Sequence, residues 1–149
     1  MICNFYSKIK GKPPYNSLFI KEIITAISRQ LKLKKNWEIT VLLVGDQEIK
    51  KLNKKFRHKN KITDVLSFSQ KEGGIMILPA EVKNYLGDII ISYPQIKRQA
   101  KKFKQPQKKE FALILIHGLL HLLGYNDETQ SGAKQMARLQ DKILNKIYG

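Results

Sequence analysis

The stretch FALILIHGLLHLLGYND, residues 111–127, combines a long apolar run with two of the chain's three histidines. The apolar part, which ends at Leu123, is too short to cross a bilayer, so we expect a buried helix. His117 and His121 lie inside it, and an imidazole without a partner is costly in an apolar interior. Other groups must therefore satisfy both rings.

The spacing of the two histidines predicts that they point the same way. Residues four apart lie on one face of a helix, about 6 Å from each other. Two imidazoles at this spacing hold one metal ion in the His-x-x-x-His segment of metalloproteases. Two core histidines bonded to carbonyl groups would give the same pattern, so both interpretations stay open at this point.

The residues after His121 favour the metal interpretation. Gly124 follows the last apolar pair where a helix commonly ends in a left-handed glycine, and the chain can then fold back over its own face. Asp127 would then be a third ligand, with Glu128 as the second choice. Alternatively, Asp127 is the N-cap of the next helix.

The rest of the chain divides into strands in the first two thirds and helices in the last third, which predicts an α+β layer architecture. At 149 residues it is the size of one domain. The expected strands are residues 1–10, 37–45, 63–68 and 87–92, with a strand and loop over 71–85. The expected helices are 17–31, one capped by Asp46, two opened by Pro94 and Pro106, and one over about 130–147.

Charge indicates a polyanionic partner. The chain has 28 lysines and arginines against 12 acidic residues, a formal net charge of +16. The basic residues gather in Lys50–Lys61 and Lys97–Lys109. Phosphate contacts of this kind give affinity without sequence choice. Nucleic acid is therefore the favoured partner, and a lysine-rich composition without function is the alternative.

The chain's start lacks the pattern of a signal peptide, and Cys3 has no partner for an internal disulfide. Both observations predict a cytoplasmic protein, and no membrane partner is expected.

Three blocks of the sequence resemble the YbeY family of bacterial endoribonucleases. They are HGLLHLLGYND (117–127), NKKFRHKNKITDVLSF (53–68) and GDIIIS (87–92), and the family signature is His-Gly-x-x-His-Leu-x-Gly-Tyr-Asp-His. The resemblance implies one α+β domain over residues 1–149 with a small mixed, mostly parallel sheet, and a metal-site helix similar to that of zincin metalloproteases. It also implies one divalent metal ion, generally zinc, single-strand-specific cleavage of ribosomal RNA in small-subunit 3′-end maturation, and a role in ribosome quality control.

The match to the family is incomplete at the third ligand. His117 and His121 match the family's first two ligands, whereas Asn126 and Asp127 stand where the family has Asp and then His. Zinc accepts an Asp oxygen, and two-His-one-carboxylate sites are established catalytic arrangements. The same set also suits ferrous iron, so the sequence leaves the identity of the metal open.

Two further residues bear on the chemistry. A metal with three protein ligands keeps a position for the water that attacks phosphorus. Gly118 occupies the place where metalloproteases carry a Glu base, so that route to peptide hydrolysis is lost. Arg57 matches a functionally important arginine of the family, and its planar group can pair with phosphate. We expect Arg57 and His117 to be catalytic, although Arg57 could instead bond the last carbonyls of its helix.

Other candidates are weaker. His58 lies among lysines and is left out of the metal set. Asp64 and Asp88 border apolar strands. They either orient the histidines by bonding the ring nitrogens that do not bind the metal, or bond to backbone. Two rival functions remain: a ribosome-associated RNA-binding assembly factor with a structural metal, and a metallohydrolase acting on something other than RNA.

Overall fold

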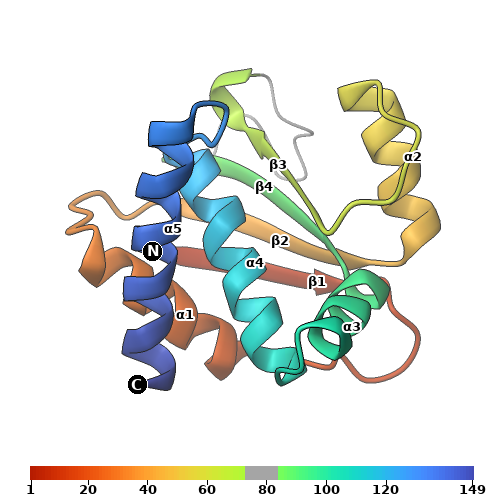
Figure 1. Ribbon diagram of the computed structural model, residues 1–149, viewed down its shortest axis with the longest axis horizontal. Helices are drawn as coiled ribbons and strands as arrows, with labels where there is room; N and C mark the ends of the chain where they lie inside the picture. Colours follow the sequence, from red (N-terminus) through yellow and green to blue (C-terminus); the bar gives the residue numbers. More distant parts are fainter. Residues whose placement is uncertain (73–83) are drawn as a thin grey trace.

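The computed structural model describes residues 1–72 and 84–149. Its strands and helices alternate along most of the chain and end in three helices (Figure 1). The elements are β1 (Ile2–Ser7), α1 (Ser17–Gln30), β2 (Glu38–Val44), α2 (Asp46–Arg57), β3 (Val65–Ser69), η1 (Gln70–Glu72), β4 (Tyr85–Ser92), α3 (Tyr93–Lys102), α4 (Gln107–Leu122) and α5 (Gln130–Tyr148).

The sheet has the strand order β1-β2-β4-β3 within the described residues. β1 pairs with β2 and β2 with β4 in parallel, whereas β3 runs antiparallel to β4. The sheet is thus mixed and mostly parallel, and the predicted α+β class is confirmed. β3 forms one edge, next to the end of α4.

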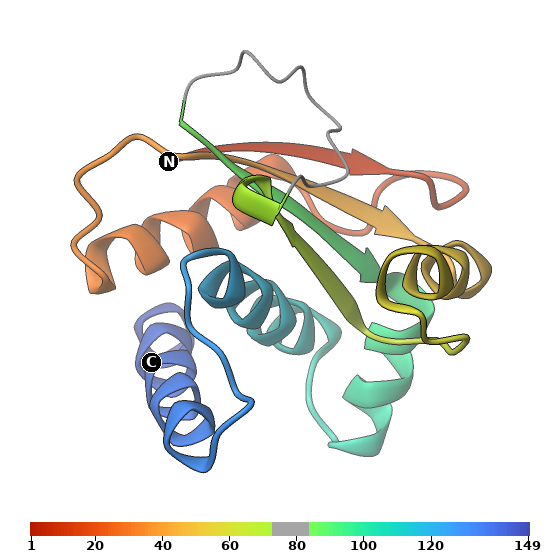
Figure 2. The ribbon, with the colours of Figure 1, turned by 90° about the horizontal axis from the view of Figure 1, so that it is seen from above.

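The two faces of β4 enter two separate cores. Ile89 and Ile91 belong to the large cluster with α1, α4 and α5, while Ile90 belongs to a smaller cluster under α2. This follows from the alternation of side chains along a strand. Every residue of β4 is buried, which accounts for its three consecutive isoleucines, 89–91. Figure 2 shows α1, α4 and α5 together on one side of the sheet.

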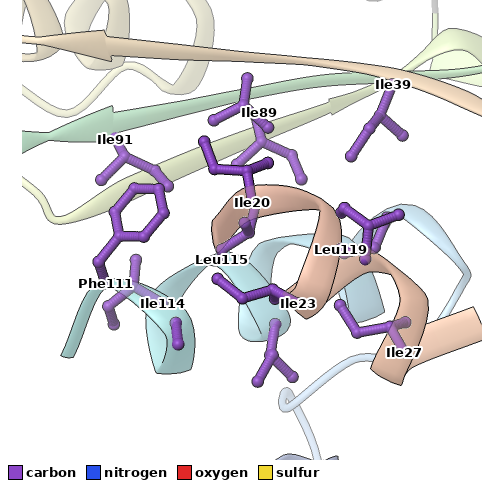
Figure 3. Close-up of a cluster of buried hydrophobic side chains, with 14 of the residues drawn as sticks. Ile20, Ile23, Ile27, Ile39, Ile89, Ile91, Phe111, Ile114, Leu115 and Leu119 are labelled. Atoms are coloured by element: carbon purple, nitrogen blue, oxygen red, sulfur yellow. The ribbon is translucent and has the colours of Figure 1, made fainter. Parts of the chain in front are cut away.

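The helix predicted from residues 111–123 is the centre of the large core. Figure 3 shows Phe111, Leu115 and Leu119 of α4 beside the isoleucines of α1, under the isoleucines of the sheet. All three are fully buried. Because α4 packs on β3, β4, α1, α3 and α5, it is apolar nearly all round, as a buried helix should be. Within the described parts of the chain, no helix is long and apolar enough to span a membrane.

Several predicted boundaries are corrected. Asp46 is the first residue of α2 rather than its cap, which is Gly45, and its carboxylate instead accepts hydrogen bonds from Ser92 and Arg98. α3 begins at Tyr93, before Pro94, with Ser92 as N-cap.

The strand predicted over 63–68 is β3, which begins two residues later and ends one residue later, and β4 begins two residues before Gly87. Most of the strand and loop predicted over 71–85 lies outside the described residues.

Candidate metal centre

The two histidines of α4 face each other near the helix's C-terminal end. The Nε2 atoms of His117 and His121 are 3.0 Å apart, and the rings meet edge to face with centroids separated by 4.5 Å. Both side chains are partly buried, with 26% and 29% of their surface exposed. The prediction that they share one face of the helix is therefore correct.

The opposite nitrogen of each ring bonds to an oxygen acceptor. His117 Nδ1 lies 2.6 Å from the amide oxygen of Gln140 in α5, and His121 Nδ1 lies 3.1 Å from the backbone carbonyl of Tyr125. An oxygen of this kind only accepts, so in the neutral imidazole each Nδ1 carries the proton and each Nε2 presents a lone pair. Two lone pairs thus point at each other in the cleft.

Asp127 completes the group. Its Oδ2 is 3.7 Å from His117 Nε2 and its Oδ1 is 3.9 Å from His121 Nε2. One ligand atom from each of the three residues lies within 4.8 Å of the others, and among the described residues this is the one His, Cys, Asp or Glu group that could hold a metal ion. Three acceptors around one point fit a divalent cation.

The turn that returns Asp127 to the histidines depends on Gly124. Its φ of 101° lies in the region that favours glycine. The Tyr125 N–H donates to the carbonyl of Leu120 at 3.0 Å, and the Gly124 N–H to that of His121 at 3.1 Å. This is the predicted left-handed helix end. The alternative role for Asp127 is wrong, because Thr129 caps α5 by accepting from the Gly132 N–H.

Electrostatics favour the metal-binding form of His121. Burial lowers its pKa, and the neighbouring His117 lowers it further, while the Asp127 carboxylate opposes both effects. The net direction is downward, toward the neutral imidazole that ligates metals.

The group opens into a cleft of about 820 Å³. The cleft lies between the end of α2 and the loop after it, the edge strand β3, the end of α4 and the loop before α5. The basic residues that line it, called its basic wall, are Arg57, Lys59 and Lys61. Asp64 and Glu128 also line it. A cation site and a basic wall therefore share one cavity.

Arg57 is fixed to the wall of the cleft rather than to its own helix. One of its Nη atoms donates to the carbonyl of Ser67 at 2.6 Å, and its guanidinium lies 4.8 Å from the centroid of the Phe68 ring. The sequence alternative, contact with the last carbonyls of its helix, does not describe this contact with β3. The resemblance named the residue, and the fold places it in the same cleft as the histidines.

Gly118 allows α4 to approach the sheet closely. A Cβ at this position would lie 3.0 Å from Ile89 Cγ2 and 3.1 Å from Ser67 Oγ. The Ser67 hydroxyl donates to the Gly118 carbonyl at 3.0 Å, which ties the metal-site helix to β3. A side chain here would point into the sheet, so this position cannot supply a base to the cleft.

The sequence analysis missed Gln140. We considered Asp64 and Asp88 as groups that orient the histidines, but the Nδ1 partners are Gln140 and a backbone carbonyl. Asp88 is fully buried and accepts a hydrogen bond from the hydroxyl of Tyr85. Gln140 contacts His117 because α5 packs on α4, and no local sequence signal marks it. His58 lies outside the metal group, at the C-cap of α2.

Fold and site together define an α+β protein with a candidate divalent-metal centre in a basic cleft. The chain belongs to the family described as Endoribonuclease YbeY, which matches residues 2–148. The predicted resemblance is thus confirmed.

Relatives of that name support the assignment over most of the chain. The one from Sulfurihydrogenibium sp. (strain YO3AOP1) is 42% identical over 130 residues, 87% of this chain and 82% of the relative. The one from Persephonella marina (strain DSM 14350 / EX-H1) is 41% identical over 142 residues, 95% and 90% of the two chains. A Thermotoga maritima protein solved in solution is similar in structure, with a TM-score of 0.65 and 26% identity, covering 99% of this chain and 90% of that one.

Proposed function

We propose that residues 1–149 form one metallohydrolase domain that cleaves single-stranded ribosomal RNA in the basic cleft. Its cofactor is one divalent ion, zinc in the first instance, held by His117 Nε2, His121 Nε2 and Asp127. The observation that carries the proposal is the convergence of these ligand atoms within 4.8 Å at the floor of a cleft walled by Arg57. Family membership supplies the reaction class, endoribonucleolytic cleavage.

The protein's own groups have distinct tasks in this proposal. Gln140 and the Tyr125 carbonyl hold both imidazoles with Nε2 unprotonated and directed into the cleft. The bound ion would polarise a phosphoryl oxygen and activate the attacking water. Arg57 neutralises the negative charge that develops on the phosphate, from a position preorganised by Ser67 and Phe68.

Lysines at the mouth of the cleft would bind the RNA backbone. Lys59 and Lys61 are exposed and line the same wall as Arg57. Such contacts act on phosphates and are independent of base sequence. They support an RNA strand as substrate. The family resemblance extends the proposal to the ribosome in the cytoplasm as the place of action, with ribosome quality control as a wider role. The net charge of +16 favours the same partner.

The test combines metal analysis of freshly purified protein with cleavage of a single-stranded rRNA fragment, with and without chelator. We expect close to one equivalent of metal per chain, and cleavage that chelation abolishes and added zinc restores. RNA binding that survives chelation without any cleavage in the loaded protein would instead indicate an assembly factor with a structural metal. Affinity for RNA that is independent of salt would favour a substrate other than RNA.

A further inference from the structure

The turn between α3 and α4 is a second basic surface, which we call the lysine corner. It comprises Lys97, Lys101, Lys102, Phe103, Lys104, Lys108 and Lys109. All but Lys109 are exposed. Residues 93–109 contain no acidic side chain. Arg98 belongs to the same segment but is bonded to Asp46, with N–O distances of 2.8 and 2.9 Å.

The nearest acid in sequence does not neutralise this surface from outside. Glu110 is only 1% exposed and accepts hydrogen bonds from the amides of Gln99, at 2.9 Å, and Gln105. Its carboxylate is therefore turned into the protein, while the lysines before it point outward. The corner presents positive charge to solvent.

Phe103 makes the corner more than a charged face. It follows α3 directly, is 58% exposed, and lies with its ring centroid 5.5 Å from the Lys102 ammonium. This apolar ring is therefore largely in contact with solvent, among lysines. Proteins that bind single strands combine these two elements, cations for the phosphates and an aromatic face on which a base stacks.

The corner is separate from the metal centre but connected to the cleft. Figure 1 shows it at the end of α4 opposite to the loop that carries Asp127. The helix rise puts Lys108 about 20 Å along the axis from His121. The Ser92 N–H, at the start of α3, donates at 3.0 Å to the carbonyl of Asp64, a residue of the cleft. α3 therefore leads from the border of the cleft to the corner, about 15 Å further on.

We propose that the lysine corner is a second RNA-binding surface, which holds the strand beyond the cleavage site by phosphate contacts with its lysines and by stacking of a base on Phe103. The inference deepens the proposed function, because it assumes that RNA is the partner. A strand bound at both places would be anchored about 20 Å from the metal centre, estimated from the helix rise.

The first test removes charge from the corner and from a matched control. Lys102→Gln/Lys104→Gln removes two charges, one from the last residue of α3 and one from the turn that follows it. The control Lys32→Gln/Lys34→Gln does the same after α1, where Lys32 has φ 52° against 53° for Lys104. Affinity for a single-stranded RNA of about 16 nucleotides is measured in chelator at several salt concentrations. We expect the salt slope to weaken by about 1.4 in the corner variant alone.

The second test removes the ring. Phe103→Ala should lower RNA affinity about tenfold, the loss expected for one stacked base. Tyr148→Ala removes an aromatic side chain that is 43% exposed at the end of α5 and should leave affinity unchanged. Melting curves of all four variants check folding. Phe103→Ala and the lysine pair are made as separate variants, so if one is unstable the other still tests the proposal.

Equal losses in the corner and control variants would reduce the effect to net charge and overturn the proposal. Unchanged RNA binding in both corner variants would also overturn it and would point to a partner other than RNA. RNA binding by the corner is tested independently of the metal centre, because binding is measured in chelator. If the corner variants bind and cleave RNA like the parent, this inference is wrong and the proposed function stands. If the corner variants bind RNA more weakly but the metal-loaded parent never cleaves it, the proposed function is wrong and this inference stands.

Discussion

The two ends of α4 each bury an ionisable group beside a glutamine, with opposite consequences. At the N-terminal end, the Glu110 carboxylate accepts from two glutamine amides and is closed off from solvent. At the C-terminal end, Gln140 satisfies only the inner nitrogen of His117, and the outer nitrogen faces the cleft. The first arrangement is complete within the protein. The second leaves a nitrogen directed to the cleft, where it can bind a cation.

The difference shows how to separate a structural polar group from a binding site in an apolar helix. Burial costs a polar group its hydration, and hydrogen bonds must replace it. Glu110 is fully compensated, so we assign it a structural role. His117 and His121 present acceptors to each other at 3.0 Å, which no hydrogen bond between unprotonated nitrogens can compensate. This arrangement of acceptors fits a shared cation, so we assign the two histidines a binding role.

The largest expected effect is that of removing the third ligand. Asp127→Ala should lose the metal and lower cleavage by roughly 10³-fold, because Lewis-acid catalysis contributes several kcal/mol. Melting temperature in chelator should stay that of the parent. Asp141→Ala, an exposed acid on α5, is the control. Unchanged metal stoichiometry in Asp127→Ala would remove Asp127 from the site, and loss in Glu128→Ala instead would reassign the ligand.

Arg57 tests whether the basic wall takes part in the reaction. Arg57→Ala should reduce the cleavage rate about 10²-fold, the typical effect of one preorganised group at a developing charge. Arg57→Lys keeps the charge but loses the planar fork, so it should recover only part of the rate. Metal content should not change. Full activity in Arg57→Ala would show that its bond to Ser67 is structural.

Gln140 tests the histidine end of α4, because it bonds the His117 nitrogen that faces away from the cleft. Gln140→Leu should weaken zinc affinity about tenfold, because His117 loses the acceptor that fixes its tautomer. Gln140→Glu, which retains an acceptor, should restore it. Gln135→Leu on the exposed side of α5 serves as control. Zinc competition titration with a coloured chelator gives the affinities, and equal values for all would assign Gln140 no positioning role.

Replacing Glu110 should have the smallest effect on function, because we expect it to change only the stability of the fold. Glu110→Ala removes the acceptor of the Gln99 and Gln105 amides and should lower the free energy of unfolding by about 2 kcal/mol. Zinc affinity and cleavage of the folded protein should match those of the parent. Urea titration combined with a cleavage assay checks both. A change in zinc affinity without loss of stability would break the distinction between the two ends of the helix.

The sequence predicted what depends on local periodicity. The spacing of His117 and His121 required a shared face, Gly124 predicted the return of the chain, and the apolar runs located the strands. Helix caps were harder to predict: the predicted cap Asp46 was wrong, and so was the alternative role of Asp127 as a cap. Asp127 and Asp46 are both good N-caps by type, yet Thr129 and Gly45 hold those positions.

Contacts between distant elements were beyond the sequence. Gln140 meets His117 only because α5 packs on α4. The bond of Arg57 to Ser67 likewise depends on how α2 lies along β3. Arg57 was identified through the family resemblance, and its environment came from the fold. The exposure of Phe103 could not be predicted from the sequence either, since an apolar residue at the end of a helix is more often buried.

The most direct test of the central claim is anomalous diffraction from crystals of the zinc-loaded protein, recorded on either side of the zinc absorption edge. We predict one strong site, about 2.0–2.2 Å from His117 Nε2, His121 Nε2 and an Asp127 oxygen. A zinc ion bound elsewhere, or one that leaves these three side chains uncoordinated, would contradict the account.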